Sequence, residues 1–154
     1  MADDRGSQMI RAKLFVCSEG ASVDARNNTI SAFHILEQVN TPGFPVVLPK
    51  ICVIALMERE TTDPSNTVLQ ISVDSGDQQL SSHPFAVNFF QSTLGRTLLE
   101  FNGFLIPRPG LLRFSLKREN EILGSWSVLI NQVEQQPPVQ MHLPPPPNPP
   151  EAVN

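Results

Sequence analysis

The chain has 154 residues, a net charge of −4 and only 17% charged residues. This length suffices for one domain with a buried core. The negative charge argues against a nucleic-acid partner, because nucleic-acid-binding proteins need a basic surface to neutralise phosphates. The apolar runs are shorter than the roughly 18 residues that span a membrane, and the polar start MADDRGSQ has no secretory core. We therefore expect a cytoplasmic protein with no membrane partner.

The first third of the chain predicts strands joined by turns. Residues 1–10 are polar and are expected to form a disordered arm. Alternation over residues 12–17 predicts a first strand, and Asn27 and Asn28 predict a turn, because asparagine tolerates left-handed geometry. Residues 29–39 then predict a second strand, the hairpin partner of the first. The segment 40–49 contains three prolines and predicts an irregular loop across an edge or end of the domain.

The middle of the chain continues the same pattern. Residues 50–60 are apolar on both faces, which is typical of a central strand. Residues 67–74 alternate and predict a half-buried strand. Pro84 lies inside the next predicted strand, residues 80–90, and demotes that part to an edge or a bulge. Residues 97–107 predict a further strand, in which Gly103 marks a bulge.

The clearest alternation lies between Phe104 and Ile130. A Pro-Gly turn at 109–110 leads into LLRFSLKR and ILGSWSVLI, two strands joined by a short polar turn. Period 2 sends alternate side chains to opposite faces of a sheet. We expect one face to carry Leu112, Phe114 and Leu116, together with Ile122, Gly124, Trp126, Val128 and Ile130, and the solvated face of the first of these strands to carry Arg113, Ser115 and Lys117.

These elements predict an all-β fold of about eight strands. Regular short strands with turn signals indicate a two-sheet antiparallel β-sandwich, with a small closed barrel as the alternative. The predicted domain spans residues 11–134. Residues 135–154 hold eight of the fifteen prolines and predict a flexible, extended tail of the polyproline II type.

The residues that could act in catalysis or bind a metal are far apart in the sequence. Cys17 and Cys52 lie in apolar runs, which favours buried free thiols. His34 and His83 show no metal-ligand spacing, and no phosphate-binding or nucleophile motif occurs. Glu58 and Glu60 share a strand face but are expected at a solvated rim. We therefore expect no catalytic residue, no metal site and no cofactor, and hence a protein that is not an enzyme.

The tail contains the sharpest binding motif in the chain. The run LPPPP resembles ligands of aromatic-grooved domains, which recognise a preformed polyproline helix. We expect these residues to contact a partner protein, the alternative being a plain spacer. The candidate partner-binding residues are Leu143, Pro144, Pro145, Pro146 and Pro147.

The pattern over residues 12–133 resembles an uncharacterised bacterial family of small immunoglobulin-like β-sandwich domains. The resemblance rests on a Cys-bearing first strand, the segment SAFHILEQV, a proline-punctuated crossing and a late hairpin. Alanine stands at position 32, where the family pattern has glycine. The resemblance implies an immunoglobulin-like sandwich and no activity. The matching residues are Cys17, Pro45, Pro49, Pro107, Gly110, Phe114 and Trp126.

Together these features favour a non-catalytic protein-interaction or accessory module that uses a sheet edge, end loops or the tail. The alternative is a small-ligand or carbohydrate-binding sandwich with a site near the 40–49 loop. A hydrolase would require His34 or His83 beside a nucleophile or carboxylate in space. The sequence leaves a homo-oligomer open.

Overall fold

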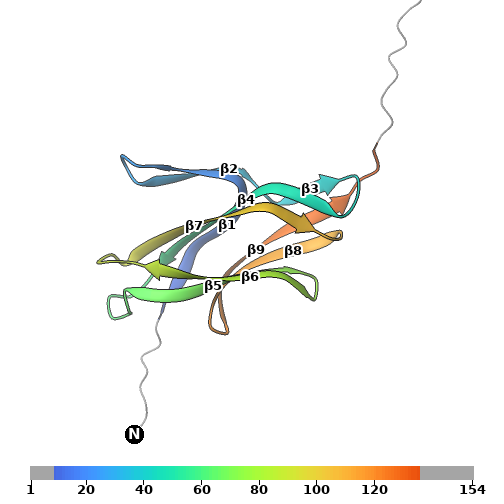
Figure 1. Cartoon of the computed structure of the whole chain (residues 1–154). Helices are drawn as coiled ribbons and strands as arrows, with labels where there is room; N and C mark the ends of the chain where they lie inside the picture. The colour runs from blue at the N-terminus through green and yellow to red at the C-terminus, as the bar shows by residue number, and fades with distance from the viewer. Residues whose placement is uncertain (1–8, 136–154) are drawn as a thin grey trace, which may run out of the picture.

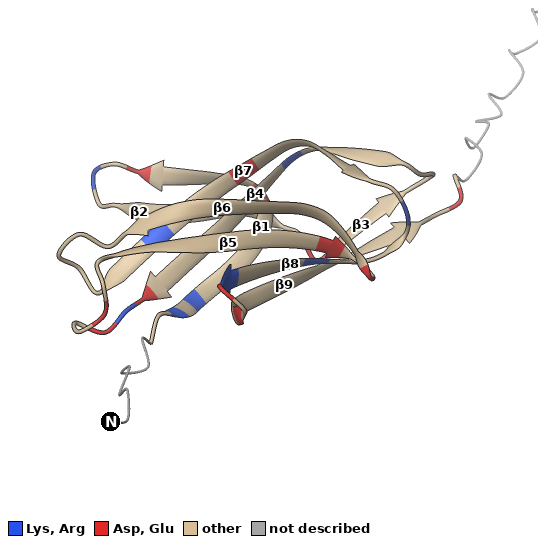
Figure 2. Cartoon of the chain, turned by 60° about the horizontal axis from the view of Figure 1, so that its bottom comes forward, with Lys and Arg blue, Asp and Glu red and all other residues tan. Residues whose placement is uncertain are grey.

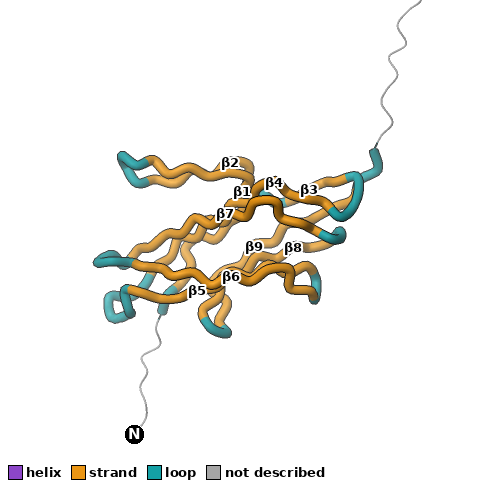
Figure 3. Tube along the Cα trace, in the orientation of Figure 1, coloured by secondary structure: helices purple, strands orange, loops and turns teal. Residues whose placement is uncertain are grey.

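The computed structural model describes residues 9–135, which form nine strands and no helix. Figure 1 labels these strands, and Figure 3 shows that only strands, turns and loops make up this part of the chain. The strands are β1 Arg11–Asp24, β2 Thr29–Ile35, β3 Gln38–Thr41, β4 Val46–Glu58, β5 Asn66–Ser75, β6 Gln78–Asn88, β7 Leu94–Ile106, β8 Gly110–Arg118 and β9 Glu121–Gln132.

The strands form two sheets that pack face to face. Sheet A has the order β2-β1-β4-β7, and sheet B has the order β3-β9-β8-β5-β6. All neighbours are antiparallel except β3 and β9, which are parallel. Two such sheets around one core make an immunoglobulin-like β-sandwich, and the predicted fold class is confirmed.

The core consists of the inward side chains of both sheets. It has the alternation expected of a two-layer fold, in which every second side chain of a strand enters the interior. The largest side chains that are almost fully buried in the described residues are Phe89, Phe114, Ile51, Ile54, Met57, Leu69, Ile71, Ile106, Leu112, Leu116 and Ile130. All of these except Ile54 belong to one cluster between the sheets.

The predicted strand at residues 29–39 is two strands in different sheets. β2 belongs to sheet A and β3 to sheet B. His34 takes a positive φ of 53°, a conformation that non-glycine residues rarely adopt, and turns the chain toward the second sheet. This crossing raises the strand number from the expected eight or so to nine.

Leu36 fixes the point at which the chain crosses. Its backbone N–H donates to the carbonyl of Cys17 in sheet A over 2.9 Å. Its own carbonyl accepts a 2.7 Å hydrogen bond from the Trp126 indole of sheet B. The Leu36 side chain is 6% exposed and belongs to the core. One residue therefore joins both sheets and the interior.

A bulge corrects the expected faces of β9. The pairing of β8 with β9 shifts between Leu116 and Lys117, and Leu123 is the extra residue. An extra residue reverses the alternation of the strand. As a result Leu123 packs against the core, whereas Ile122, expected on the core face, is 59% exposed.

The 40–49 segment is less irregular than its prolines suggest. β4 begins at Val46 and includes Pro49, so the connecting loop covers only residues 42–45. Pro49 lies opposite Gly103 of β7, which has a φ of 64°. Beyond this pair, Leu48 and Phe104 turn toward the core. The predicted bulge at Gly103 is therefore wrong: Gly103 has a left-handed backbone, but the register of the two strands does not shift.

The hairpin of β1 and β2 leaves the plane of sheet A and lies over its outer face (Figures 1 and 3). Within the sheet, β2 would lie three strands, or roughly 14 Å, from β7. Yet Arg96 of β7 donates a hydrogen bond to the carbonyl of Asn28 at the hairpin tip. Val16 and Ile54 point away from the sandwich core and are nevertheless 4% and 2% exposed, which is consistent with this cover.

Both cysteines are free and buried. Cys17 lies in the core, and burial raises the pKa of its thiol far above the ordinary value. Cys52 lies on the outer face of sheet A, where its thiol faces the carbonyl of Glu19 at 4.0 Å and a carboxylate oxygen of Glu100 at 3.9 Å. Burial also raises the pKa of Cys52. Both thiols are therefore held in the unreactive protonated form.

We predict that Leu36→Ala lowers the free energy of unfolding by about 2–5 kcal/mol, because it removes a buried side chain at the junction of both sheets. Urea titration followed by Trp126 fluorescence measures this change. The control Ile122→Ala removes an exposed side chain and should change stability by less than about 0.5 kcal/mol. Equal effects of the two substitutions would contradict the assigned faces.

We predict that the two thiols react slowly with a disulfide reagent in the native protein and rapidly in urea. Burial keeps both thiols protonated and out of contact with the reagent. A Thr61→Cys variant supplies an exposed thiol as a positive control for the native reaction. Rapid reaction of either thiol in the unsubstituted native protein would contradict this prediction.

Candidate functional site

A groove of about 280 Å³ opens beside the crossing from sheet A to sheet B. Its apolar wall combines Leu36, Val39 of β3 and the start of β4, where Leu48 and Pro49 lie. Glu19 of β1 and Lys50 of β4 supply its charged lining. We call these six residues the crossover groove. The predicted ligand region near residues 40–49 therefore contributes two residues, Leu48 and Pro49, to a real concavity.

A hydrogen bond and an ion pair hold the two charged groups of the groove. The Glu19 carboxylate accepts a 2.8 Å hydrogen bond from Nδ1 of His34, which lies directly across the hairpin. Lys50 Nζ lies 2.8 Å from a carboxylate oxygen of Glu100 on β7. The hydrogen bond to Glu100 raises the pKa of Lys50 above its ordinary value, so Lys50 stays a cation at neutral pH.

The strand β2, which ends just before the groove, is a free sheet edge. Within the described residues it pairs only with β1, so the backbone groups on its other side have no strand partner. Phe33 is 51% exposed and Ile35 is 53% exposed. The two exposed side chains flank His34, whose φ of 53° interrupts the extended backbone between them.

The other three sheet edges carry features that oppose pairing with a further strand. β3 has only four residues, and β6 contains Pro84 in the position expected for an edge strand. β7 carries two charged residues, and its Phe101 ring contacts the His83 ring of β6 at 5.8 Å. β2 has no proline, no bulge and, besides His34, no ionisable side chain. It is the least protected edge of the described sandwich.

The candidate residues identified from the sequence do not meet in one place. Trp126 is half-buried against the core, and its indole N–H is bonded to Leu36, so it is an anchor of the crossing. His34 is exposed on the hairpin, whereas His83 lies on β6 beside Phe101. Among residues 9–135, no three His, Cys, Asp or Glu side chains are arranged to hold a metal ion.

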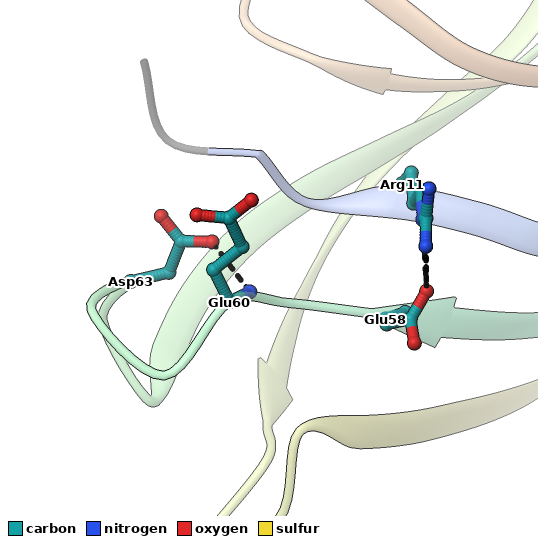
Figure 4. A network of polar contacts seen from close by, with 4 residues as sticks. All are labelled: Arg11, Glu58, Glu60 and Asp63. Atoms are coloured by element: carbon teal, nitrogen blue, oxygen red, sulfur yellow. Dashed lines mark hydrogen bonds and ion pairs between the residues drawn. The ribbon is translucent and has the colours of Figure 1, made fainter. Parts of the chain in front are cut away.

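Glu58 and Glu60 lie at the end of β4, as expected for a rim (Figure 4). Glu58 forms an ion pair with Arg11 of β1 at 2.5 Å, and the hydrogen bond from Arg11 lowers the pKa of Glu58. The backbone N–H of Glu60 donates to the Asp63 carboxylate at 2.9 Å. These contacts pin the ends of β1 and β4 and separate the two glutamates into different interactions.

The proline motif Leu143–Pro147 lies outside the described residues. The described chain ends at residue 135, beside the loop that follows β3. There the N–H of Val133 donates to the carbonyl of Thr41, and the Gln132 amide donates to the carbonyl of Pro42. None of the described residues forms a helix able to cross a membrane.

Sequence reasoning missed the free edge of β2. The run TISAFHI is as apolar as a strand with one buried face, and burial was the natural expectation for Phe33 and Ile35. The hairpin lifts these residues away from the core instead.

The fold resembles parts of solved structures at low sequence identity. A β-glucosidase from Listeria innocua in complex with glucose shares 8% identity with a TM-score of 0.45, over 83% of this chain and 16% of the enzyme chain. An immunoglobulin-like protein from Pseudomonas aeruginosa shares 10% identity with a TM-score of 0.39, over 80% and 97% of the two chains. The chain thus spans about one sixth of the length of the β-glucosidase.

No curated protein matches the chain. A family model matches residues 13–131, from the first strand to the end of the last. This range is most of the described sandwich, and the expected membership of an uncharacterised sandwich family is confirmed. The chain belongs to the family of unknown function DUF6941.

Proposed function

We propose that this protein is a non-catalytic interaction module that binds an extended segment of a partner protein along β2. The observation that carries the proposal is the unprotected edge of sheet A, with exposed backbone groups and the exposed side chains Phe33 and Ile35. An added strand gains main-chain hydrogen bonds for affinity and side-chain contacts for specificity.

The crossover groove extends this surface. A segment paired with β2 would leave the strand at Leu36, where the groove begins. The apolar wall of Leu36, Val39, Leu48 and Pro49 suits one aliphatic side chain of the partner. Glu19 and Lys50 are charges of opposite sign at the same groove and favour a polar or zwitterionic neighbour beside that side chain.

We propose a binding role because of the chemical groups that the β2 edge and the crossover groove expose. Its groups are backbone amides and carbonyls, apolar side chains, Glu19, which is hydrogen-bonded to His34, and Lys50, which is ion-paired with Glu100. Such a combination recognises an extended apolar peptide in known strand-addition complexes. The tail motif Leu143–Pro147 remains a second proposed contact with a partner protein.

We predict that peptides selected from a displayed random library against the native protein bind at β2. The double variant Phe33→Lys/Ile35→Lys places two charges on the edge and should weaken binding of the selected peptides at least about tenfold. Fluorescence anisotropy of labelled peptides measures the affinity. Hydrogen exchange should show slower exchange of β2 amides in the complex.

The matched control is Val47→Lys/Leu105→Lys. These two residues are paired on β4 and β7 and are 53% and 54% exposed, but they lie away from β2. The control should bind the selected peptides as the unsubstituted protein does. Equal binding by the β2 variant would show that the edge is not the interaction surface.

A second candidate function is binding of a small ligand in the crossover groove. The groove volume of about 280 Å³ lies just below the range of about 300–1,000 Å³ that is usual for ligand sites. Its wall is mainly apolar, which favours an aliphatic molecule with one charged group over a sugar.

We predict that an aliphatic carboxylate or amine, such as octanoate or octylamine, shifts the methyl NMR signals of Leu36, Val39 and Leu48. Leu48→Trp fills the groove and should abolish these shifts, whereas Val47→Trp, on the neighbouring exposed position, should preserve them. If neither ligand moves these signals, the groove is only the end of the strand-addition surface.

A further inference from the structure

The outer face of sheet B carries a row of serines across four adjacent strands. Ser72 of β5 lies directly opposite Ser82 of β6 and Ser115 of β8, and Ser115 lies opposite Ser125 of β9. The hydroxyls lie on the face away from the core, because the neighbours Ile71, Val73, Leu116 and Phe114 are core residues. We call these four residues the serine row.

The hydrogen bonding of the serine row is incomplete at Ser72 in a single copy of the chain. It is 1% exposed, and its hydroxyl oxygen has no hydrogen-bond partner among the described residues. A buried hydroxyl without a partner is costly, on the order of 1–3 kcal/mol. The flanking side chains on its own strand, Gln70 and Asp74, are half-buried, and the Gln70 amide donates a hydrogen bond to the Ser82 hydroxyl rather than to Ser72.

Asp74 and Arg113 form the next row on the same face. They lie directly opposite each other on β5 and β8, yet neither side chain forms an ion pair or hydrogen bond within residues 9–135. Lys117 and Gln70 form the corresponding row on the other side of the serines. The serine row is therefore flanked by an acid–base pair on one side and by an amide–base pair on the other.

Exposed apolar side chains surround this polar centre. All of them lie on strands of sheet B and project to its outer face, opposite to the buried neighbours on the same strands. Figure 2 views this sheet from its outer side, and much of the ribbon between the strand ends is uncharged. The apolar residues are Val68, 65% exposed, Leu111, 45%, Ile122, 59%, and Leu129, 41%.

We propose that the chain forms a two-fold homodimer by packing this outer face of sheet B against the same face of a second copy. The two-fold axis runs parallel to the strands, between β5 and β8. This operation places β5 of one copy on β8 of the other and keeps the rows in register. Asp74 then faces Arg113 of the second copy twice, and Ser72 faces Ser115 twice.

The self-complementarity is what selects a second copy as the occupant. A two-fold interface must match a surface with itself, residue against residue. An axis perpendicular to the strands would place Arg113 against Lys117 and is excluded by like charge. In the parallel arrangement each charged row faces an opposite or neutral group, and Ile122 of β9 meets Pro84 of β6.

The size of the face predicts the strength of the dimer. Four strands about 4.8 Å apart and about nine residues long span roughly 20 Å by 30 Å, or about 600 Å² for each copy. Interfaces below about 1,200 Å² in total are generally weak or transient. A dimer that dissociates on dilution is therefore expected. It uses a different sheet from the β2 edge and does not depend on the proposed binding of a partner there.

Sedimentation velocity of the full chain over a range of concentrations tests the proposal. The unsubstituted protein should show a monomer–dimer equilibrium. Asp74→Arg creates Arg–Arg contacts across the interface and Arg113→Asp creates Asp–Asp contacts, so each single variant should raise the dimer dissociation constant at least about tenfold. An equimolar mixture of the two variants should recover a dimer, because every facing pair then has opposite charge.

The mixture separates contacts between copies from contacts within one copy. Pairing of residues 74 and 113 inside a chain cannot change when two variants are mixed, so recovery requires the interface. Thermal melts of each variant check that both remain folded. Arg11→Glu and Glu58→Arg serve as controls, since this pair is also directly opposed in register but lies in sheet A; both should dimerise as the unsubstituted protein does.

Three results overturn the proposal. One is an unsubstituted protein that remains monomeric at the highest soluble concentration. Another is a dimer that the single charge reversals leave unchanged, which would place the contact elsewhere. The last is a mixture that stays monomeric. A monomer in which inorganic phosphate shifts the amide signals of Ser72 and Ser115 would assign the serine row to an anion.

Discussion

The chain crosses repeatedly between its two sheets, and Leu36 holds the first of these crossings, from β2 to β3. Its N–H is bonded to sheet A, its carbonyl is bonded to the Trp126 indole of sheet B, and its side chain is buried. A buried backbone group without a partner would be costly, so these contacts define where β2 ends and β3 begins.

The same crossing creates the surfaces that are available for binding. The chain leaves sheet A after Leu36, β2 has no strand neighbour on its outer side among the described residues, and the hairpin tip is tied over the sheet by Arg96. The crossover groove forms where the two sheets part around Leu36. A strand with free backbone groups and exposed Phe33 and Ile35 is the type of surface that adds a partner strand.

The two outer faces of the sandwich differ in kind. Sheet A is covered by its own hairpin, which accounts for the burial of Val16 and Ile54 on the side away from the core. Sheet B is uncovered and has small hydroxyl side chains at its centre, with Ser72 lacking a partner. The outer face of sheet A is therefore closed by the chain itself, whereas the outer face of sheet B is open for contact with another molecule.

Local pattern determined the all-β class, the core faces of β5 and β8, the edge position of Pro84 and the turn at 109–110, because period-2 alternation and proline geometry act over a few residues. Tertiary structure alone decided three further features: the split of residues 29–39 at Leu36, the outward turn of Ile122 beyond the Leu123 bulge, and the exposure of Phe33. The same alternation of apolar residues occurs in a strand whether its apolar face meets the core, a second sheet or solvent. Only the packing of residues distant in the chain, above all Leu36 with Cys17 and Trp126, determines which of these a strand meets.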